Sequence, residues 1–220
     1  MGVHSLLEET VDRIRNDILK RHILPGERLN VDGLARAFGT SKTPVREALN
    51  VLVAERLVLY RPRLGYSVQK LSVGEFIETS ETQQAIEQYI LLKLARNAVA
   101  LDFDRLTSIN LEIEHAIGEE NPIRIFELNK AFHLEMYERC GNEKIIVELK
   151  RIWNELLIHR YNMFASTAFL SCIVDDHTVI MDAMRTRNLQ AILAALDRHF
   201  ENGVSGASEN YGEPMGAISQ

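Results

Sequence analysis

Helical periodicity runs from Ser72 to about residue 203, and this feature restricts the possible folds more than any other. Apolar residues recur there at spacings of three and four, and no run shows the apolar–polar alternation of a strand. Helix stop and start signals divide the segment, namely Asp102, Asn121-Pro122, Gly141-Asn142 and Asn188. The pattern predicts an all-α bundle of six to seven helices over residues 71–204.

Apolar runs and cysteine content indicate the expected cellular location of the protein. No apolar run approaches the roughly 20 residues that a membrane span needs, so we expect no membrane contact. Cys140 and Cys172 are the only cysteines, which is too few for a disulfide scaffold and favours a reducing, cytoplasmic location. Residues 205–220 are rich in Gly, Ser and Glu without periodicity, and we expect a disordered tail there.

The first 70 residues follow a different plan. Helical spacing over residues 6–21 ends at a Pro25-Gly26 turn, and the short helix VDGLARAFG follows. A third helix starts at TPVREAL, with Thr43 as the expected N-cap. The β-prone runs LVLY and GYSV then flank RPRL, which reads as a hairpin turn. This order of three helices and a hairpin predicts a winged helix-turn-helix domain over residues 1–70.

The charges divide along the same boundary. The whole chain carries a net charge of −6. Residues 1–70 hold 12 Lys/Arg against 8 Asp/Glu, whereas residues 71–220 hold 13 against 23. A basic module joined to an acidic one suggests that only the first module contacts nucleic acid.

The third helix starts with cations, which is unfavourable for an isolated helix. A helix N-terminus carries partial positive charge and favours Asp or Glu, yet Lys42 and Arg46 stand there. Both are well placed if phosphates and guanine edges lie beyond the helix end, because a helix-turn-helix inserts this end into the major groove. Arg61 and Arg63 in the hairpin would act as a wing and reach the adjacent DNA backbone or the minor groove. The alternative is a solvated helix start with incidental basic residues.

The same segment resembles a known family. GERLNVDGLARAFGTSKTPVREALNVLVAERLVLYRPRLGYSV is similar to the winged helix of GntR-family transcription regulators, and the similarity covers residues 10–69. The resemblance implies sequence-specific binding to operator DNA. It also implies the DNA-contacting residues, which are Ser41, Lys42, Thr43, Arg46 and the wing residue Gly65.

Three histidines of the helical segment occupy apolar helix faces. His133 shares a face with Phe126 and Met136, and His177 and His199 each interrupt an apolar stripe on a later helix. Three helices therefore direct imidazoles toward a common interior. A divalent metal would satisfy all three, and neutral imidazole suits Zn, Ni, Cu or Fe. The alternative is a set of hydrogen-bonded core histidines.

Residues 72–203 resemble the FCD ligand-binding domain of the FadR-type branch of the GntR family. The resemblance implies a divalent metal, Zn or Ni, held by Asn129, His133, His177 and His199, with a small carboxylate metabolite at or near it. Asn129 stands where the family usually has Asp, so the metal is expected to be weakly bound. Gln83 stands where many members have an Arg that faces the effector, which makes Gln83 a candidate effector-binding residue.

Three functions from different classes fit these residues. The first is a metabolite-responsive transcriptional regulator that binds a pseudo-palindromic operator as a homodimer and is not an enzyme. The second is a His-ligated metalloenzyme with an attached DNA-binding module, with Asp175 or Asp176 as general base. The third is a constitutive DNA-binding scaffold whose helical domain holds no ligand.

Overall fold

The computed structural model describes residues 5–163 and 167–211 of the chain. It is mainly helical, and its contacts separate two compact units. The described residues up to Leu71 form the first unit together with Lys150–Ile158, and the other described residues form the second. No helix among the described residues has both the length and the apolarity that a bilayer crossing requires.

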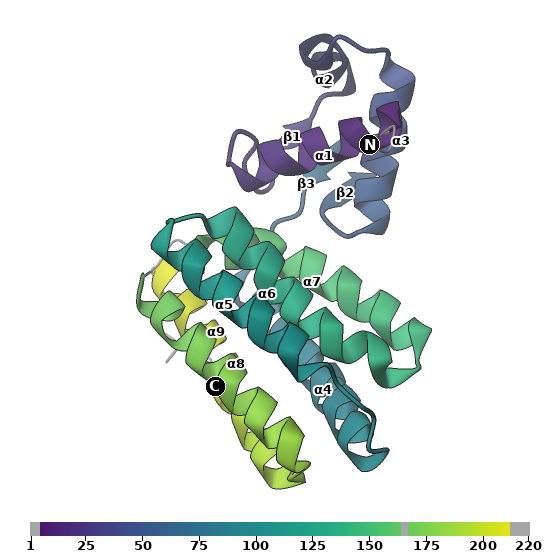
Figure 1. Ribbon diagram of the computed structural model, residues 1–220. Helices are drawn as coiled ribbons and strands as arrows, with labels where there is room; N and C mark the ends of the chain where they lie inside the picture. The colour runs from purple at the N-terminus through teal and green to yellow at the C-terminus, as the bar shows by residue number, and fades with distance from the viewer. Residues whose placement is uncertain (1–4, 164–166, 212–220) are drawn as a thin grey trace. The chain divides into compact units, whose positions relative to one another are not determined.

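The N-terminal unit is a winged helix-turn-helix, as the sequence predicts (Figure 1). Its elements are α1 (Leu6–Leu19), β1 (Arg28–Leu29), α2 (Val31–Phe38), α3 (Lys42–Ala54), β2 (Val58–Arg61) and β3 (Gly65–Val68). The three strands form an antiparallel sheet in the order β1-β3-β2. Helix α1 packs on α3 through fully buried apolar side chains, among them Ile14, Ile18, Leu49 and Leu52.

Two local predictions in this unit need correction. Helix α3 begins at Lys42, and its N-cap is Ser41 rather than Thr43, two residues earlier than expected. Pro44 then lies in the first turn, where its missing N–H removes no helical hydrogen bond. Strand β1 was not predicted, because two residues are too few to show alternation; it pairs Arg28 with Ser67 and Leu29 with Tyr66.

The second unit contains six helices in the described part of the chain, within the predicted six to seven. They are α4 (Val73–Arg96), α5 (Phe103–Gly118), α6 (Pro122–Tyr137), α7 (Glu143–Met163), α8 (Thr167–Thr186) and α9 (Leu189–Tyr211), with a short 3₁₀ turn η1 (Glu138–Cys140) after α6. Helix pairs α5–α6, α8–α9, α4–α9 and α5–α8 pack along their lengths (Figure 1).

Helix α9 is longer than expected. It continues to Tyr211, so residues 205–211 are helical where the sequence predicted the start of a disordered tail. Glycine in a helix costs only about 1 kcal/mol relative to alanine, and the Ala, Ser and Glu residues between the glycines tolerate a helix. Residues 212–220 of the predicted tail lie outside the described residues.

Candidate functional site

The N-terminus of α3 lacks the side-chain cap that other helices of the molecule have. Ser41 is the N-cap but makes no capping hydrogen bond with its hydroxyl. Side chains do cap α1, α2, α4, α5 and α6, through Ser5, Asn30, Ser72, Asp102 and Asn121. The first-turn N–H groups of α3 and the exposed side chains of Ser41, Lys42 and Thr43 thus remain accessible to an anionic partner.

A groove of about 430 Å³ lies between α2, α3 and the wing. It brings together Arg46 and Gly65, two residues that the sequence singled out. Arg28, Tyr60 and Tyr66 line it as well, which sequence reasoning missed because they lie on strands that pair only in the fold. Tyr66 is held there because its hydroxyl donates a hydrogen bond of 2.8 Å to Asn50 Oδ1.

The wing ends in a tight turn that presents two arginines. The amide of Leu64 donates to the carbonyl of Arg61 over 3.1 Å, and Arg63 takes a positive φ of 66° inside this turn. A φ of 82° at Gly65 returns the chain to β3. A positive φ at a residue other than glycine costs conformational energy. The turn thus holds Arg63 exposed at its tip in an unfavourable backbone conformation.

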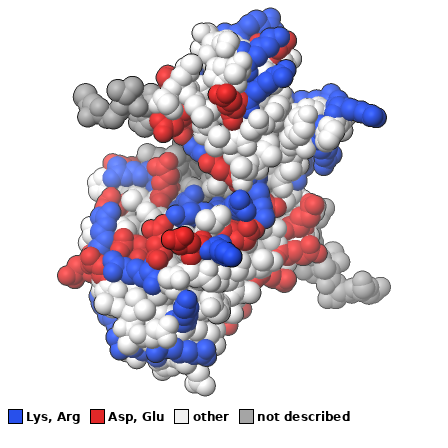
Figure 2. All heavy atoms as spheres, turned by 90° about the vertical axis from the view of Figure 1, so that its right-hand side faces the viewer, with Lys and Arg blue, Asp and Glu red and all other residues white. Residues whose placement is uncertain are grey.

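Positive charge on this unit is largely unneutralised. No described residue forms an ion pair with Arg28, Arg46, Arg61 or Arg63, and all four side chains are exposed. Figure 2 shows Lys and Arg side chains prominent on the upper part of the molecule, which is the N-terminal unit. Lys42 differs, because its Nζ lies 2.9 Å from Asp32 Oδ1.

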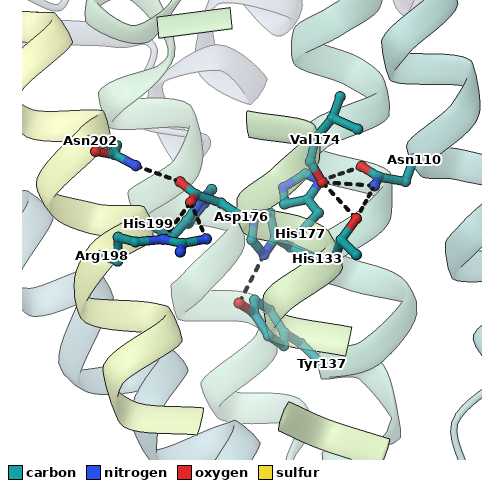
Figure 3. Close-up of polar contacts among 10 residues, drawn as sticks. Asn110, His133, Tyr137, Val174, Asp176, His177, Arg198, His199 and Asn202 are labelled. Carbon is teal, nitrogen blue, oxygen red and sulfur yellow. Dashed lines mark hydrogen bonds and ion pairs between the residues drawn. The ribbon is translucent and has the colours of Figure 1, made fainter. Parts of the chain in front are cut away.

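The second candidate site is a cluster of three imidazoles inside the helical unit (Figure 3). His133 comes from α6, His177 from α8 and His199 from α9. His133 and His177 are fully buried, and the side chain of His199 is 12% exposed. One potential ligand nitrogen from each ring lies within 4.8 Å of the other two, so a single ion could contact all three. The predicted common interior is therefore present.

The orientation of His177 is set by Asn110 of α5. The Asn110 amide nitrogen donates to Val174 O at 3.0 Å and to Thr178 Oγ1 at 3.3 Å, which fixes which end of the amide faces the imidazole. Asn110 Oδ1 lies 3.0 Å from His177 Nδ1 and can only accept, so Nδ1 carries the proton. His177 Nε2 is buried with no hydrogen-bond partner among the described residues, and its lone pair is available to a metal.

His133 is oriented by a chain of buried polar groups. Its Nδ1 lies 2.9 Å from the Tyr137 hydroxyl, which donates to Glu87 Oε2 over 2.7 Å. The single hydroxyl proton is used on Glu87, so Nδ1 of His133 is the donor. Gln83 completes the chain by donating its amide to Glu87 Oε1. Burial raises the pKa of Glu87, although hydrogen bonds from Tyr137 and Gln83 oppose the rise.

His199 faces a carboxylate. Its Nδ1 lies 3.7 Å from Asp176 Oδ2, beyond hydrogen-bond length but within ion-pair range. Asp176 is buried and is also held by Arg198 and Asn202, each at 2.8 Å. Burial raises the pKa of Asp176, but these neighbours together hold it below its ordinary value. Asp176 is thus a buried carboxylate with both oxygens bonded to Arg198 and Asn202, which does not favour the general-base role of the metalloenzyme alternative.

The electrostatics suit a metal. Burial lowers the pKa of His133 and of His177 well below 6.5, and the neighbouring imidazoles lower both further. Both rings are therefore neutral at pH 7, which is the form that binds a cation. His177 Nδ1 faces Asn110 of α5, and His133 Nδ1 faces the Tyr137 hydroxyl one turn later on α6. Oxygens in these positions orient histidine ligands. The residues present fit a divalent metal.

Asn129 and Gln83 are both buried but differ in their contacts. Asn129 lies one turn before His133 on α6, and its Oδ1 has no hydrogen-bond partner among the described residues. Such an oxygen is suited to a weak fourth ligand. Gln83 lies at the far end of the chain that leads through Glu87 and Tyr137 to His133.

Comparison with known proteins decides the family. Residues 6–68 match the family described as bacterial regulatory proteins, gntR family, and residues 78–202 match the FCD domain. The chain belongs to the GntR family. Within that family it is a regulator of the FadR type, with an N-terminal helix-turn-helix and a C-terminal FCD domain.

Several GntR-type relatives span nearly the whole chain. The HTH-type transcriptional repressor GlaR of Escherichia coli is 24% identical over 194 residues, which cover 84% of this chain and 88% of GlaR. The HTH-type transcriptional regulator BphR of Paraburkholderia xenovorans is 25% identical over 210 residues, 93% of this chain and 86% of BphR. These relatives are transcriptional regulators and not enzymes.

Solved structures show the same fold. E. coli McbR/YncC has a TM-score of 0.78 at 18% identity, covering 95% of this chain and all of that one. A GntR regulator from Rhodococcus has a TM-score of 0.76 at 19% identity, covering 94% of this chain. The order of a winged helix-turn-helix followed by a helical FCD domain is therefore confirmed.

Proposed function

We propose that this GntR regulator binds a pseudo-palindromic operator as a homodimer and responds to a small carboxylate metabolite. The observation that supports DNA binding most directly is the N-terminus of α3, where Ser41 makes no side-chain capping bond. One turn later the helix presents the exposed Arg46, which forms no ion pair with any described residue. Free N–H groups, the helix dipole and a cation act there on one anionic partner. Ser41 and Thr43 add hydroxyl donors to phosphate, and Arg63 and Gly65 place the wing against the duplex.

Arg46→Ala tests this assignment. Arg46 has the chemistry for a bidentate contact with guanine O6 and N7, so its loss should weaken binding to a selected duplex by about 1–3 kcal/mol and relax base preference. Arg124→Ala, which removes an exposed arginine of the helical unit, is the matched control. Fluorescence anisotropy with a labelled duplex gives both affinities. Equal affinities of wild type and Arg46→Ala, with circular dichroism unchanged, would refute the assignment.

The proposed homodimer follows from the small number of base pairs that one winged helix can contact. One winged helix contacts only a few base pairs, so useful specificity needs two copies on two half-sites. The dimer contacts are assigned to the helical domain. Light scattering should give twice the chain mass at micromolar concentration. A monomer with and without DNA would contradict the homodimer and the pseudo-palindromic operator together.

The effector site is placed at the histidine cluster. His133, His177 and His199 hold a divalent ion, Zn or Ni, with Asn129 as a weak fourth ligand. The ion supplies a Lewis-acidic coordination point for a carboxylate. Because the imidazole ligands are neutral, the site keeps its positive charge, which favours an anionic effector. Gln83 is assigned to the effector site because Glu87 and Tyr137 connect it to His133. Relatives that carry a different side chain at this position are expected to bind a different effector.

Regulation then requires a difference in affinity between two states. An effector shifts the DNA-binding equilibrium only if it binds one arrangement of the helical domain more tightly than another. Thermal-shift measurements with a panel of small carboxylates, with and without Zn or Ni, test this proposal. Stabilisation that needs both the carboxylate and the metal supports it, whereas identical melting under all conditions contradicts it.

A further inference from the structure

An ion pair stands at the entrance to α3. Asp32 occupies the first turn of α2 and Lys42 is the first residue of α3, and their charged atoms lie 2.9 Å apart. The two side chains are 58% and 60% exposed. An exposed pair of this kind adds little to folding stability. Asn30 already caps α2, with its Oδ1 accepting from Asp32 N and Gly33 N, so capping does not require the Asp32 carboxylate.

The pair is unusual for a surface that attracts phosphate. Arg28, Arg46, Arg61 and Arg63 form no ion pair with any described residue. Lys42, in contrast, is paired with a carboxylate that DNA phosphates would repel. Because the Lys42–Asp32 pair has no net charge, it contributes little to the attraction between the protein and the phosphate backbone of DNA. Its donor and acceptor are suited to reading hydrogen-bonding groups on base edges, and the first residues of the recognition helix are the ones that reach those edges.

The ion pair is complementary to a base pair that presents a donor beside an acceptor in the major groove, and its chemistry favours G·C. In a G·C pair the cytosine N4 donor and the guanine O6 acceptor are hydrogen-bonded to each other, about 2.9 Å apart. The Lys42 ammonium and the Asp32 carboxylate have the same separation and the complementary polarity. An A·T pair also offers a donor beside an acceptor, but thymine O4 lies next to a methyl group. Guanine instead gives the ammonium a second acceptor, N7.

We propose that Asp32 and Lys42 together read one G·C base pair in each operator half-site, with Asp32 accepting from cytosine N4 and Lys42 donating to guanine. This inference rests on the proposed DNA-binding function. It makes Asp32 a specificity residue that reduces binding to other sequences, since the carboxylate repels DNA wherever the cytosine amine is missing.

The test compares the DNA that wild type and Asp32→Ala select from a random duplex library. The wild-type consensus should contain a G·C pair that Asp32→Ala no longer requires, with the remaining positions unchanged. Replacing that pair by A·T should cost wild type about 5- to 150-fold in affinity and Asp32→Ala less than about 3-fold. Asp32→Asn should move the preference from cytosine toward adenine, the base that an amide reads.

Salt dependence supplies a second readout. Without Asp32 the Lys42 ammonium is free to contact phosphate, so Asp32→Ala should bind calf-thymus DNA more tightly. The slope of the logarithm of the binding constant against the logarithm of the salt concentration should be steeper by about 0.9. The matched control is Asp12→Ala, which removes an exposed carboxylate paired with Arg15 on α1 of the same unit. That control should leave both the consensus and the slope as in wild type.

The outcomes separate this inference from the function on which it rests. If wild type selects no consensus, the proposed operator binding fails and the inference fails with it. If wild type selects a consensus but Asp32→Ala selects the same one, with the same cost for every base replacement, only the reading by Asp32 is refuted. A required A·T pair at the Asp32-dependent position would also refute it. Circular dichroism of each variant verifies that the fold is intact.

Discussion

Asn110→Ala should weaken metal binding although Asn110 is not expected to touch the metal. The substitution removes the Asn110 oxygen that lies 3.0 Å from His177 Nδ1, and that N–H then has no acceptor among the described residues. The free energy of unfolding of the metal-free protein should fall by about 1–3 kcal/mol. The metal dissociation constant should rise about 10- to 100-fold, because the imidazole is no longer held with Nε2 toward the cluster.

Two further variants separate the lost acceptor from a general disturbance of the core. Asn110→Asp keeps an oxygen for His177 Nδ1 and should retain wild-type metal affinity or exceed it. Thr178→Val removes a partner of the Asn110 amide but leaves the contact with His177, so affinity should change by less than about 3-fold. Competition titration with a zinc indicator measures all four proteins. Wild-type affinity in Asn110→Ala would refute the orienting role.

Two other predictions follow from the same cluster. Asn129→Asp should raise metal affinity, because a carboxylate in place of the amide neutralises part of the ion's charge; indicator competition measures this, and unchanged affinity would exclude Asn129 as a ligand. In EDTA, the free energy of unfolding should fall as pH drops below about 6.5, because unfolded histidines then bind protons that folded His133 and His177 do not. The loss is at most about 1.4 kcal/mol per pH unit for each histidine, and urea unfolding that is independent of pH between about 5.5 and 7.5 would contradict it.

The features of the fold and of the candidate sites that the sequence predicts are those encoded in short, continuous patterns. The cations at α3 and the inward face of each histidine lie within one turn or one helix. The order of three helices and a hairpin is a succession of such short segments. Helical periodicity decides which residues face inward, so the meeting of His133, His177 and His199 could be anticipated without a structure.

The outer partners of the histidines could not be predicted in the same way. Asn110 lies 67 positions from His177, and Glu87 lies 50 positions from Tyr137. Which residues meet at that separation depends on how α4, α5, α6 and α8 pack. One signal was present, because Asn110 interrupts an apolar stripe of α5 much as the histidines interrupt theirs. The position of the α3 N-cap was missed for a smaller reason: Ser41 and Thr43 are both good caps, and neither uses its side chain there.

The number of metal ions bound per chain shows whether the three histidines of the helical domain form a metal site. Wild type and His177→Ala are equilibrated with excess Zn or Ni, passed through a desalting column and analysed by inductively coupled plasma mass spectrometry. We expect one ion per chain in wild type and almost none in His177→Ala. The reason is that His177 supplies a ligand nitrogen that is buried and has no hydrogen-bond partner among the described residues. Wild type that retains no more metal than His177→Ala would show that the three histidines form a polar core, and that an effector must bind elsewhere.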